Sequence, residues 1–177
     1  IVCPSTMEAS RDLFCPDSEK SFFKFAKKAT DEQFDVFVSH CWFDATYISV
    51  IEKVHPKMGT LYYWDIKTSG IISGVSLLSR RQLQQLKGKQ TKEWTFWIDR
   101  ACIDQECEEM KAHATQKFET YIKNTNALIV LLSPDYFTRL WCIFEYCSFI
   151  VHRDMQSIAV YTWAFMDRLE DTSAVTD

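Results

Sequence analysis

The sequence predicts an α/β fold in which a doubly wound, mainly parallel sheet is flanked by helices. Apolar strand-like segments alternate with helical segments along the chain, which is typical of this class. Residues 127–132 (ALIVLL) lack the polar alternation of a half-exposed strand, as expected for a parallel strand covered on both faces. With 177 residues, of which 47% are hydrophobic, the chain is predicted to form one domain, 1–177, around a single core.

Four segments are predicted to be strands, because they are short, apolar and rich in β-branched or aromatic residues. After Asp167 the sequence becomes polar and no further strand is evident. The core of the domain is therefore expected at about 34–165. The four segments are 34–39 (FDVFVS), 94–99 (WTFWID), 127–132 and 156–163 (QSIAVYTW).

Helices are predicted between these strands from apolar residues at helical spacing and from capping residues. Asp44 caps the second helix, Gly88 closes the third, and Ser133-Pro134 resembles an N-cap followed by proline at the first helical position. Residues 1–30 are interpreted as a helical extension and 56–93 as an insertion. The predicted helices lie at about 18–29, 44–55, 76–87, 108–124 and 140–153.

The charge and the apolar runs of the sequence argue against nucleic acid and membrane as partners. The net charge is −4, and no Lys/Arg cluster is interleaved with aromatics, so nucleic acid is not expected as a partner. The longest strictly apolar run, 127–132, is far shorter than the ~18 residues that span a bilayer, so no membrane insertion is expected. The chain starts at Ile1 and is interpreted as part of a longer protein.

The seven cysteines are odd in number and form no compact framework, which favours a reduced, cytoplasmic setting. Two pairs, Cys102/Cys107 and Cys142/Cys147, enclose four residues each, but side chains five apart on a helix point about 140° away from each other. No metal site is therefore predicted. His40 and Cys41 are adjacent at a strand end and are expected to point to opposite faces, which argues against a thiol–imidazole nucleophile.

Polar and aromatic residues follow the strands, where doubly wound sheets bind their ligands. The three segments are SHCWFD after the first strand, DRACIDQE after the second and SPDYFTRLWCIFE after the third. For some of these residues a structural role remains open as an alternative to ligand binding. Ser39 and Asp44 can cap the helix after the first strand, and Asp99 can pair with Arg100. The candidate binding residues are Ser39, His40, Cys41, Trp42, Asp44, Asp99, Arg100, Trp141 and Cys142.

Glu145 is the only formally charged side chain between Leu140 and His152. A carboxylate in such an apolar segment must be paired, hydrogen-bonded, protonated or open to a cavity, because burying it alone costs several kcal/mol. Trp141 precedes it by four residues and shares its helix face. The structural alternatives are an ion pair between Glu145 and an arginine, and a core position for Trp141; the arginines considered are Arg100, Arg139 and Arg153.

The motifs FDVFVSHCWFD, WIDRACIDQ, ALIVLLSPDY and LWCIFEY together resemble a divergent Toll/interleukin receptor (TIR) domain over about residues 34–163. Members of that family have a flavodoxin-like topology and carry W-x-x-x-E on the helix after the third strand, here residues 141–145. The resemblance implies one of two functions. Some TIR domains cleave NAD⁺ with this glutamate, and others assemble signalling complexes without catalysis.

The nucleosidase function is chemically consistent with the residues. The sequence lacks G-x-G-x-x-G, G-x-x-x-x-G-K-[ST] and G-x-S-x-G, so NAD⁺ is expected as a consumed substrate, with no cofactor. The pyridinium of NAD⁺ leaves as neutral nicotinamide and needs no general acid, unlike the leaving oxygen of an ordinary glycoside. Glu145 is therefore predicted to be the catalytic residue, stabilising the oxocarbenium ion that develops.

The resemblance further implies self-association with other TIR domains, a homo-oligomer when active, and a role in signalling or defence such as innate immunity or cell death. The alternative is a non-enzymatic TIR scaffold. A third, weaker alternative is an enzyme like the nucleoside deoxyribosyltransferases, which attack the same class of N-glycosidic bond with a glutamate.

Overall fold

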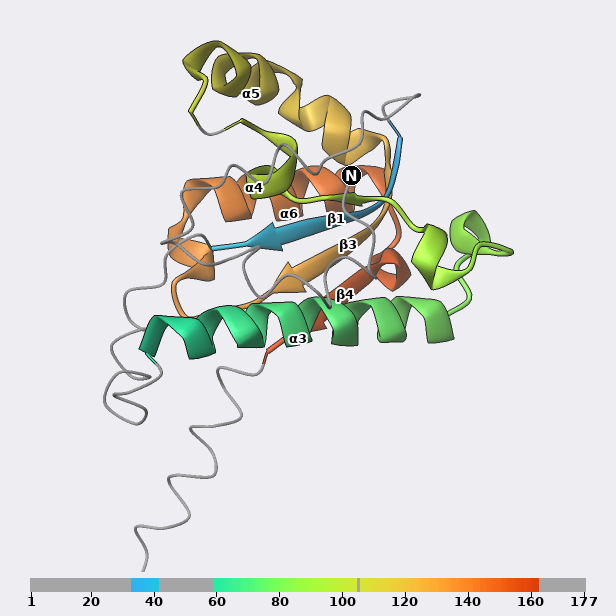
Figure 1. The fold of residues 1–177 in the computed structure, drawn as a ribbon. Coiled ribbons are helices and arrows are strands. Elements are labelled where there is room, and N and C mark those ends of the chain that lie inside the picture. The colour runs from blue at the N-terminus through green and yellow to red at the C-terminus, as the bar shows by residue number, and fades with distance from the viewer. Residues whose placement is uncertain (1–32, 42–58, 105, 163–177) are drawn as a thin grey trace, which may run out of the picture.

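A computed structural model describes residues 33–41, 59–104 and 106–162, except for the side chains of 59–65 and 100. Its centre is a sheet of four parallel strands in the order β2-β1-β3-β4 (Figure 1). This order is that of flavodoxin-like doubly wound sheets, so the predicted fold class is confirmed. The strands are β1 (Phe34–His40), β2 (Phe96–Trp97), β3 (Thr125–Leu131) and β4 (Ile158–Tyr161).

The two middle strands are buried on both faces. Every residue of β1 is buried, and it pairs with β3 from Phe34 opposite Thr125 to His40 opposite Leu131. On its other side β1 pairs with β2, with Val36 opposite Phe96. A strand covered on both faces has no solvent side, which explains why its sequence lacks polar alternation.

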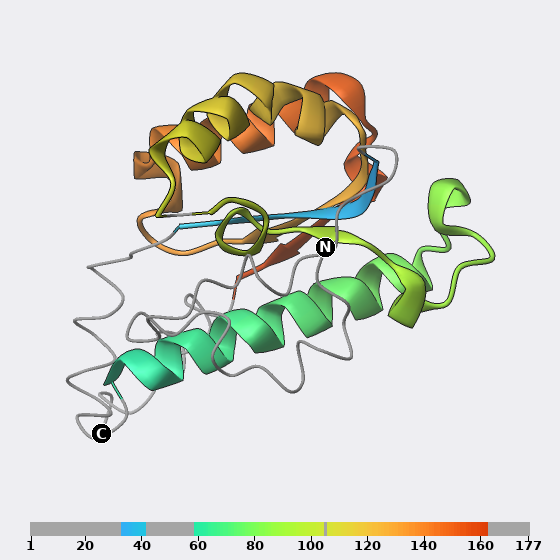
Figure 2. The ribbon, with the colours of Figure 1, turned by 45° about the horizontal axis from the view of Figure 1, so that its top comes forward.

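Helices cover both faces of the sheet, as Figures 1 and 2 show from two directions. One long helix lies along one face, and two shorter helices pack together on the other. Short 3-10 turns connect several elements. The helices are α3 (Gly59–Arg80), α4 (Asp99–Cys102), α5 (Glu108–Lys123) and α6 (Leu140–His152), and the turns are η3 (Gln84–Leu86), η4 (Thr91–Glu93), η5 (Tyr136–Thr138) and η6 (Met155–Ser157).

The sheet divides the hydrophobic core into two halves. Between the sheet and α3 lies an aliphatic half that includes Ile71 and Leu78 of the helix. The half under α5 and α6 is aromatic: Phe37 stacks on Trp97 with ring centroids 4.4 Å apart, and Phe118 of α5 meets Trp97 edge-on at 5.3 Å. Parallel strands alternate their side chains between these halves, so neighbouring residues of β1 face different surroundings.

The prediction of a helix at 76–87 closed by Gly88 is wrong. Helix α3 runs from Gly59 to Arg80, and Gln82, with φ of 47°, lies in the left-handed region just beyond its end. Gly88 is also left-handed, with φ of 88°, but it lies in the loop after η3. Most of the segment 56–93, predicted as an insertion, therefore supplies the helix that covers one face of the sheet.

Two glycines inside α3 explain why its length was missed. A Cβ at Gly74 would lie 2.9 Å from Ile129, and one at Gly70 would lie 2.7 Å from Tyr161. These glycines let the helix approach the sheet closely, whereas in a sequence they indicate a loop.

Other boundaries also differ from the prediction. The second strand contains only residues 96–97, and Asp99 opens the short helix α4 where a loop was expected. Ser133 does not cap a helix, since η5 follows it and α6 starts at Leu140. The predicted helices at 108–124 and 140–153 are confirmed as α5 and α6. The predicted helices at 18–29 and 44–55 lie outside the described residues.

In the described part of the chain, none of the helices combines the length and apolar character needed to cross a membrane.

Gly74→Ala should destabilise the domain by about 1–3 kcal/mol, because the added methyl group presses on Ile129 in a packed core. The intrinsic helix preference for alanine, about 1 kcal/mol, acts in the opposite direction. Urea unfolding measures the difference. Ser69→Ala, at an exposed position of the same helix, is the matched control and should be neutral. A Gly74→Ala protein more stable than the native chain would contradict the close packing.

Candidate functional site

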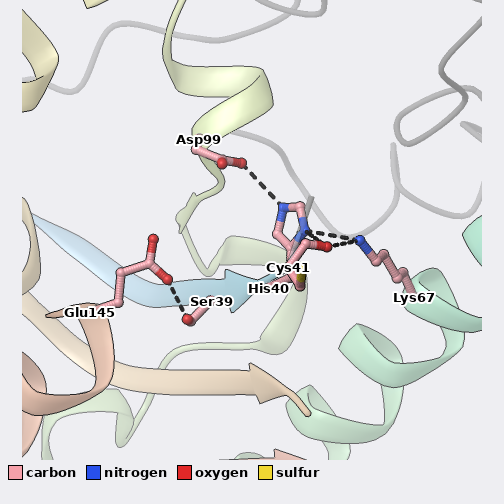
Figure 3. Close-up of polar contacts among 6 residues, drawn as sticks. All are labelled: Ser39, His40, Cys41, Lys67, Asp99 and Glu145. Carbon is pink, nitrogen blue, oxygen red and sulfur yellow. Dashed lines mark hydrogen bonds and ion pairs between the residues drawn. The ribbon is translucent and has the colours of Figure 1, made fainter. Parts of the chain in front are cut away.

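Glu145 lies buried on α6, with 6% of its surface exposed, above the carboxyl end of β1. Ser39, from the end of β1, donates a hydrogen bond to Glu145 Oε2 (Figure 3). The Ser39 hydroxyl also lies 2.5 Å from the hydroxyl of Tyr136, which comes from η5. Of the alternatives for a carboxylate in this apolar helix, the structure therefore shows hydrogen bonding, with Glu145 at the end of a chain of hydroxyl groups.

The alternative that Glu145 forms an ion pair with Arg139 or Arg153 is wrong. No lysine or arginine of the described side chains forms a salt bridge with Glu145. Arg153 instead donates to the carbonyls of Thr125 at 3.0 Å and Lys123 at 2.8 Å. The side chain of Arg100 lies outside the described residues.

Burial raises the pKa of Glu145 well above its ordinary value of 4.5. The hydrogen bond from Ser39 acts in the opposite direction, because it stabilises the ionised form, and the negative charge of Asp99 raises the pKa further. The free protein therefore favours the protonated carboxyl group more strongly than a surface glutamate does. A cation that enters the site would shift Glu145 towards its ionised form.

Tyr136 and Cys142 surround this carboxyl group as neutral groups. Burial, the main cause, and the charge of Glu145 raise the pKa of both the Tyr136 hydroxyl and the Cys142 thiol. Tyr136 also contacts the carbonyl of Cys142, at 3.3 Å. Each hydroxyl can donate only one hydrogen bond. When Glu145 is ionised, Tyr136 donates to Ser39 and Ser39 donates to Glu145. When Glu145 is protonated, the direction can reverse, so that Glu145 donates to Ser39, Ser39 to Tyr136, and Tyr136 to the carbonyl of Cys142.

A pocket of about 210 Å³ opens beside Glu145, between α5, α6 and the residue that follows α4. Trp141 is 54% exposed, so it is not a core aromatic; it packs on Phe118 with ring centroids 5.4 Å apart. An indole in this position forms an apolar wall beside the carboxyl group. The lining residues are Ile103, Lys111, Thr115, Phe118, Trp141 and Glu145.

A second polar cluster surrounds His40, the residue after Ser39 on β1. His40 Nε2 lies 3.2 Å from Asp99 Oδ1, and the Nζ of Lys67 lies 3.1 Å from His40 Nδ1 (Figure 3). Lys67 is 3% exposed and also donates to the carbonyl of Cys41. An ammonium group can only donate, so Nδ1 of His40 accepts and Nε2–H faces the Asp99 carboxylate.

The predicted residues therefore fall into separate groups. Ser39 binds Glu145, whereas His40 contacts both Asp99 and Lys67, and Lys67 also donates to the carbonyl of Cys41. The structural alternative for Asp99, a pairing with Arg100, has no described side chain to test it. Cys142 is buried and does not line the pocket, and Trp141 does. Trp42 and Asp44 lie outside the described residues.

Three site residues were missed by the sequence reasoning: Lys67, Lys111 and Tyr136. Lys67 lies on α3, which was interpreted as part of an insertion, and Lys111 is a half-buried lysine in the first turn of α5. Tyr136 had a signal in the sequence, since it belongs to the segment SPDY after the third strand. Among the described residues, no group of three or more His, Cys, Asp or Glu is placed to hold a metal ion.

Fold and site together define a doubly wound α/β domain with a hydroxyl-bound glutamate and an aromatic pocket at the carboxyl end of its central strand. The family model of the heterokaryon incompatibility protein (HET) matches residues 36–136, more than half of the chain. The chain belongs to this family. The match runs from β1 to Tyr136 and ends before α6.

This membership corrects the resemblance to TIR domains. Alternating strands and helices with polar strand ends are common to doubly wound domains, and W-x-x-x-E is a short motif, so these features did not distinguish the two families. No curated protein and no solved structure matches the chain.

The raised pKa of Glu145 has a consequence for stability. A carboxyl group with a raised pKa binds its proton more tightly in the folded state, so the free energy of unfolding falls as pH rises above 4.5 towards the raised value. Glu145→Gln should remove this fall, by about 1.4 kcal/mol for each pKa unit. Urea unfolding between pH 4 and pH 9 measures it, with exposed Glu109→Gln as control. Parallel curves for native and Glu145→Gln proteins would contradict the raised pKa.

Proposed function

We propose that this domain is an NAD⁺ nucleosidase that cleaves the bond between nicotinamide and ribose, with Glu145 as the catalytic residue. The observation that carries the proposal is a buried glutamate that forms no salt bridge with a described side chain, is oriented by a hydroxyl, and lines a pocket with an exposed tryptophan. A carboxylate kept only for packing has no need of a pocket. Perturbed carboxyl groups in pockets are characteristic of catalytic sites.

The reaction suits a site with one carboxylate. The bond between C1′ of the ribose and the pyridinium nitrogen breaks, and its electron pair returns to the ring, which leaves as neutral nicotinamide. Glu145 stabilises the positive charge that develops on the ribose. The oxygen of a water molecule then bonds to C1′, and the water loses one proton, first to Glu145 and then to solvent.

The electrostatics of the pocket support a cationic substrate. The pyridinium carries a positive charge, which lowers the pKa of a neighbouring carboxyl group and so favours the ionised form that catalysis needs. Trp141 offers its indole face to a cationic aromatic ring, an interaction worth about 1–2 kcal/mol when partly desolvated. Ser39 and Tyr136 hold the carboxylate in place as its charge changes.

Glu145→Gln should lower nicotinamide release from NAD⁺ by at least about 100-fold, since it keeps the size of the side chain and removes the charge. The assay uses the concentrated domain with and without a crowding agent, so that the release rate is measured with and without conditions that favour assembly. Glu119→Gln is the control, at an exposed position of α5 that is not part of the pocket lining. Equal release by the native and Glu145→Gln proteins would overturn the proposal.

A second candidate function is a non-enzymatic assembly module that acts in signalling or defence. The observation that favours it is an apolar stripe on the outer side of α6. Its members recur at helical spacing and carry no charge, so the stripe suits contact with other copies of the domain. The stripe contains Leu140, which is 80% exposed, Phe144, Cys147 and Val151, which is 75% exposed.

Val151→Lys should shift the concentrated domain towards the monomer in light scattering, because a charge in the middle of an apolar contact is costly to desolvate. Gln116→Lys, on the exposed side of α5, adds the same charge elsewhere and should leave the mass unchanged. If Val151→Lys loses both assembly and nicotinamide release, the nucleosidase activity depends on assembly through this stripe. A mass that is the same in all three proteins would exclude this stripe as the contact.

A further inference from the structure

The pocket beside Glu145 is lined by one acidic and one basic side chain that differ in burial. Glu145 is 6% exposed, whereas Lys111 of α5 has a side chain that is 36% exposed. Thr115 lies one turn further along α5, and its hydroxyl donates to the carbonyl of Lys111 at 2.9 Å, so this hydroxyl is already used within the helix. Lys111 is the cationic side chain among the lining residues. A ligand with a cationic part inside and an anionic part outside fits this arrangement.

The size of the pocket limits what can enter it. Pockets that enclose a whole drug-sized ligand measure roughly 300–1,000 Å³, and this one measures about 210 Å³. It can therefore enclose only part of a dinucleotide. If the nicotinamide and its ribose lie beside Glu145 and Trp141, the 5′-phosphate leaves the pocket on the side of Lys111.

We propose that Lys111 binds the 5′-phosphate of the substrate, so that the domain acts on pyridine nucleotides in preference to the corresponding nucleoside. This inference rests on the proposed nucleosidase function. The substrate class is then pyridine compounds that carry a negatively charged 5′-phosphate, and Lys111 is a specificity-determining residue.

The start of α5 adds to the attraction for a phosphate. Lys111 lies at the end of the first turn of this 16-residue helix, and Cys107 at the N-cap provides no side-chain hydrogen bond to the free N–H groups. The helix dipole places a partial positive charge at this end. The opposing charges are Glu108 and Glu109 of the same turn, and Glu108 pairs with Lys111 at 2.7 Å.

A phosphate can replace Glu108 as the anionic partner of Lys111. Glu108 is 86% exposed, and exposed pairs at this spacing on a helix are worth only a few tenths of a kcal/mol. The monoester phosphate of nicotinamide mononucleotide carries nearly two negative charges at pH 7, and the two phosphates of NAD⁺ carry one each. Either group competes more strongly for the ammonium group than one solvated carboxylate does. Glu108 therefore limits the affinity for phosphate, and its removal should increase it.

The test compares nicotinamide release from nicotinamide riboside, nicotinamide mononucleotide and NAD⁺. Lys111→Met should lower the ratio of kcat/KM for mononucleotide over riboside about tenfold. Glu108→Gln should raise the same ratio two- to threefold. Lys123→Met, an exposed lysine at the other end of α5, is the control and should leave the ratio unchanged. A ratio that is the same in the native and Lys111→Met proteins would overturn the inference.

Failure of the proposed function gives a different result. If the native protein releases nicotinamide from none of the three compounds, the nucleosidase proposal fails. Calorimetric titration with ADP-ribose then tests Lys111 without catalysis. A dissociation constant about tenfold weaker in Lys111→Met would support the phosphate contact, and equal constants would overturn it.

Discussion

The hydrogen bond from Ser39 to Glu145 is the interaction on which the site depends, because it joins the central strand to α6. A buried ionised carboxylate without a partner costs several kcal/mol, and the hydroxyl reduces this cost without neutralising the charge as an arginine would. Tyr136 supports Ser39 from η5. The end of β1 and two consecutive elements much later in the sequence, η5 and α6, therefore hold one carboxyl group in a low-dielectric place where it can act on a cation.

The alternation of β1 separates this carboxyl group from a second network. Ser39 faces α6, and the next residue, His40, meets Asp99 and Lys67 (Figure 3). Lys67 can reach His40 because α3 lies close to the sheet, and this approach depends on Gly70 and Gly74. Lys67 of α3 thus contacts the end of β1 on one face of the sheet, while Glu145 of α6 contacts it on the other.

Membership of the heterokaryon incompatibility family and the proposed chemistry rest on different parts of the chain. The family match covers β1 to Tyr136 and includes Ser39, Lys67 and Lys111. Trp141 and Glu145 follow it on α6. The pocket is formed where these parts meet, since α5 carries Lys111 and Phe118, and α6 carries Trp141 and Glu145.

The sequence by itself determined the fold class, the strands β1 and β3, and the helices α5 and α6, because these depend on local apolar periodicity. It also identified Glu145, since one charge in an apolar helix is visible without a structure. Only the tertiary structure decided its partner: Ser39 lies 106 residues away, where an arginine had been considered. It also decided the length of α3, the place of Lys67 and the position of Lys111 at the pocket, because these depend on the distance between a helix and the sheet or another helix. Such distances are set by long-range packing, which periodicity along the chain does not record.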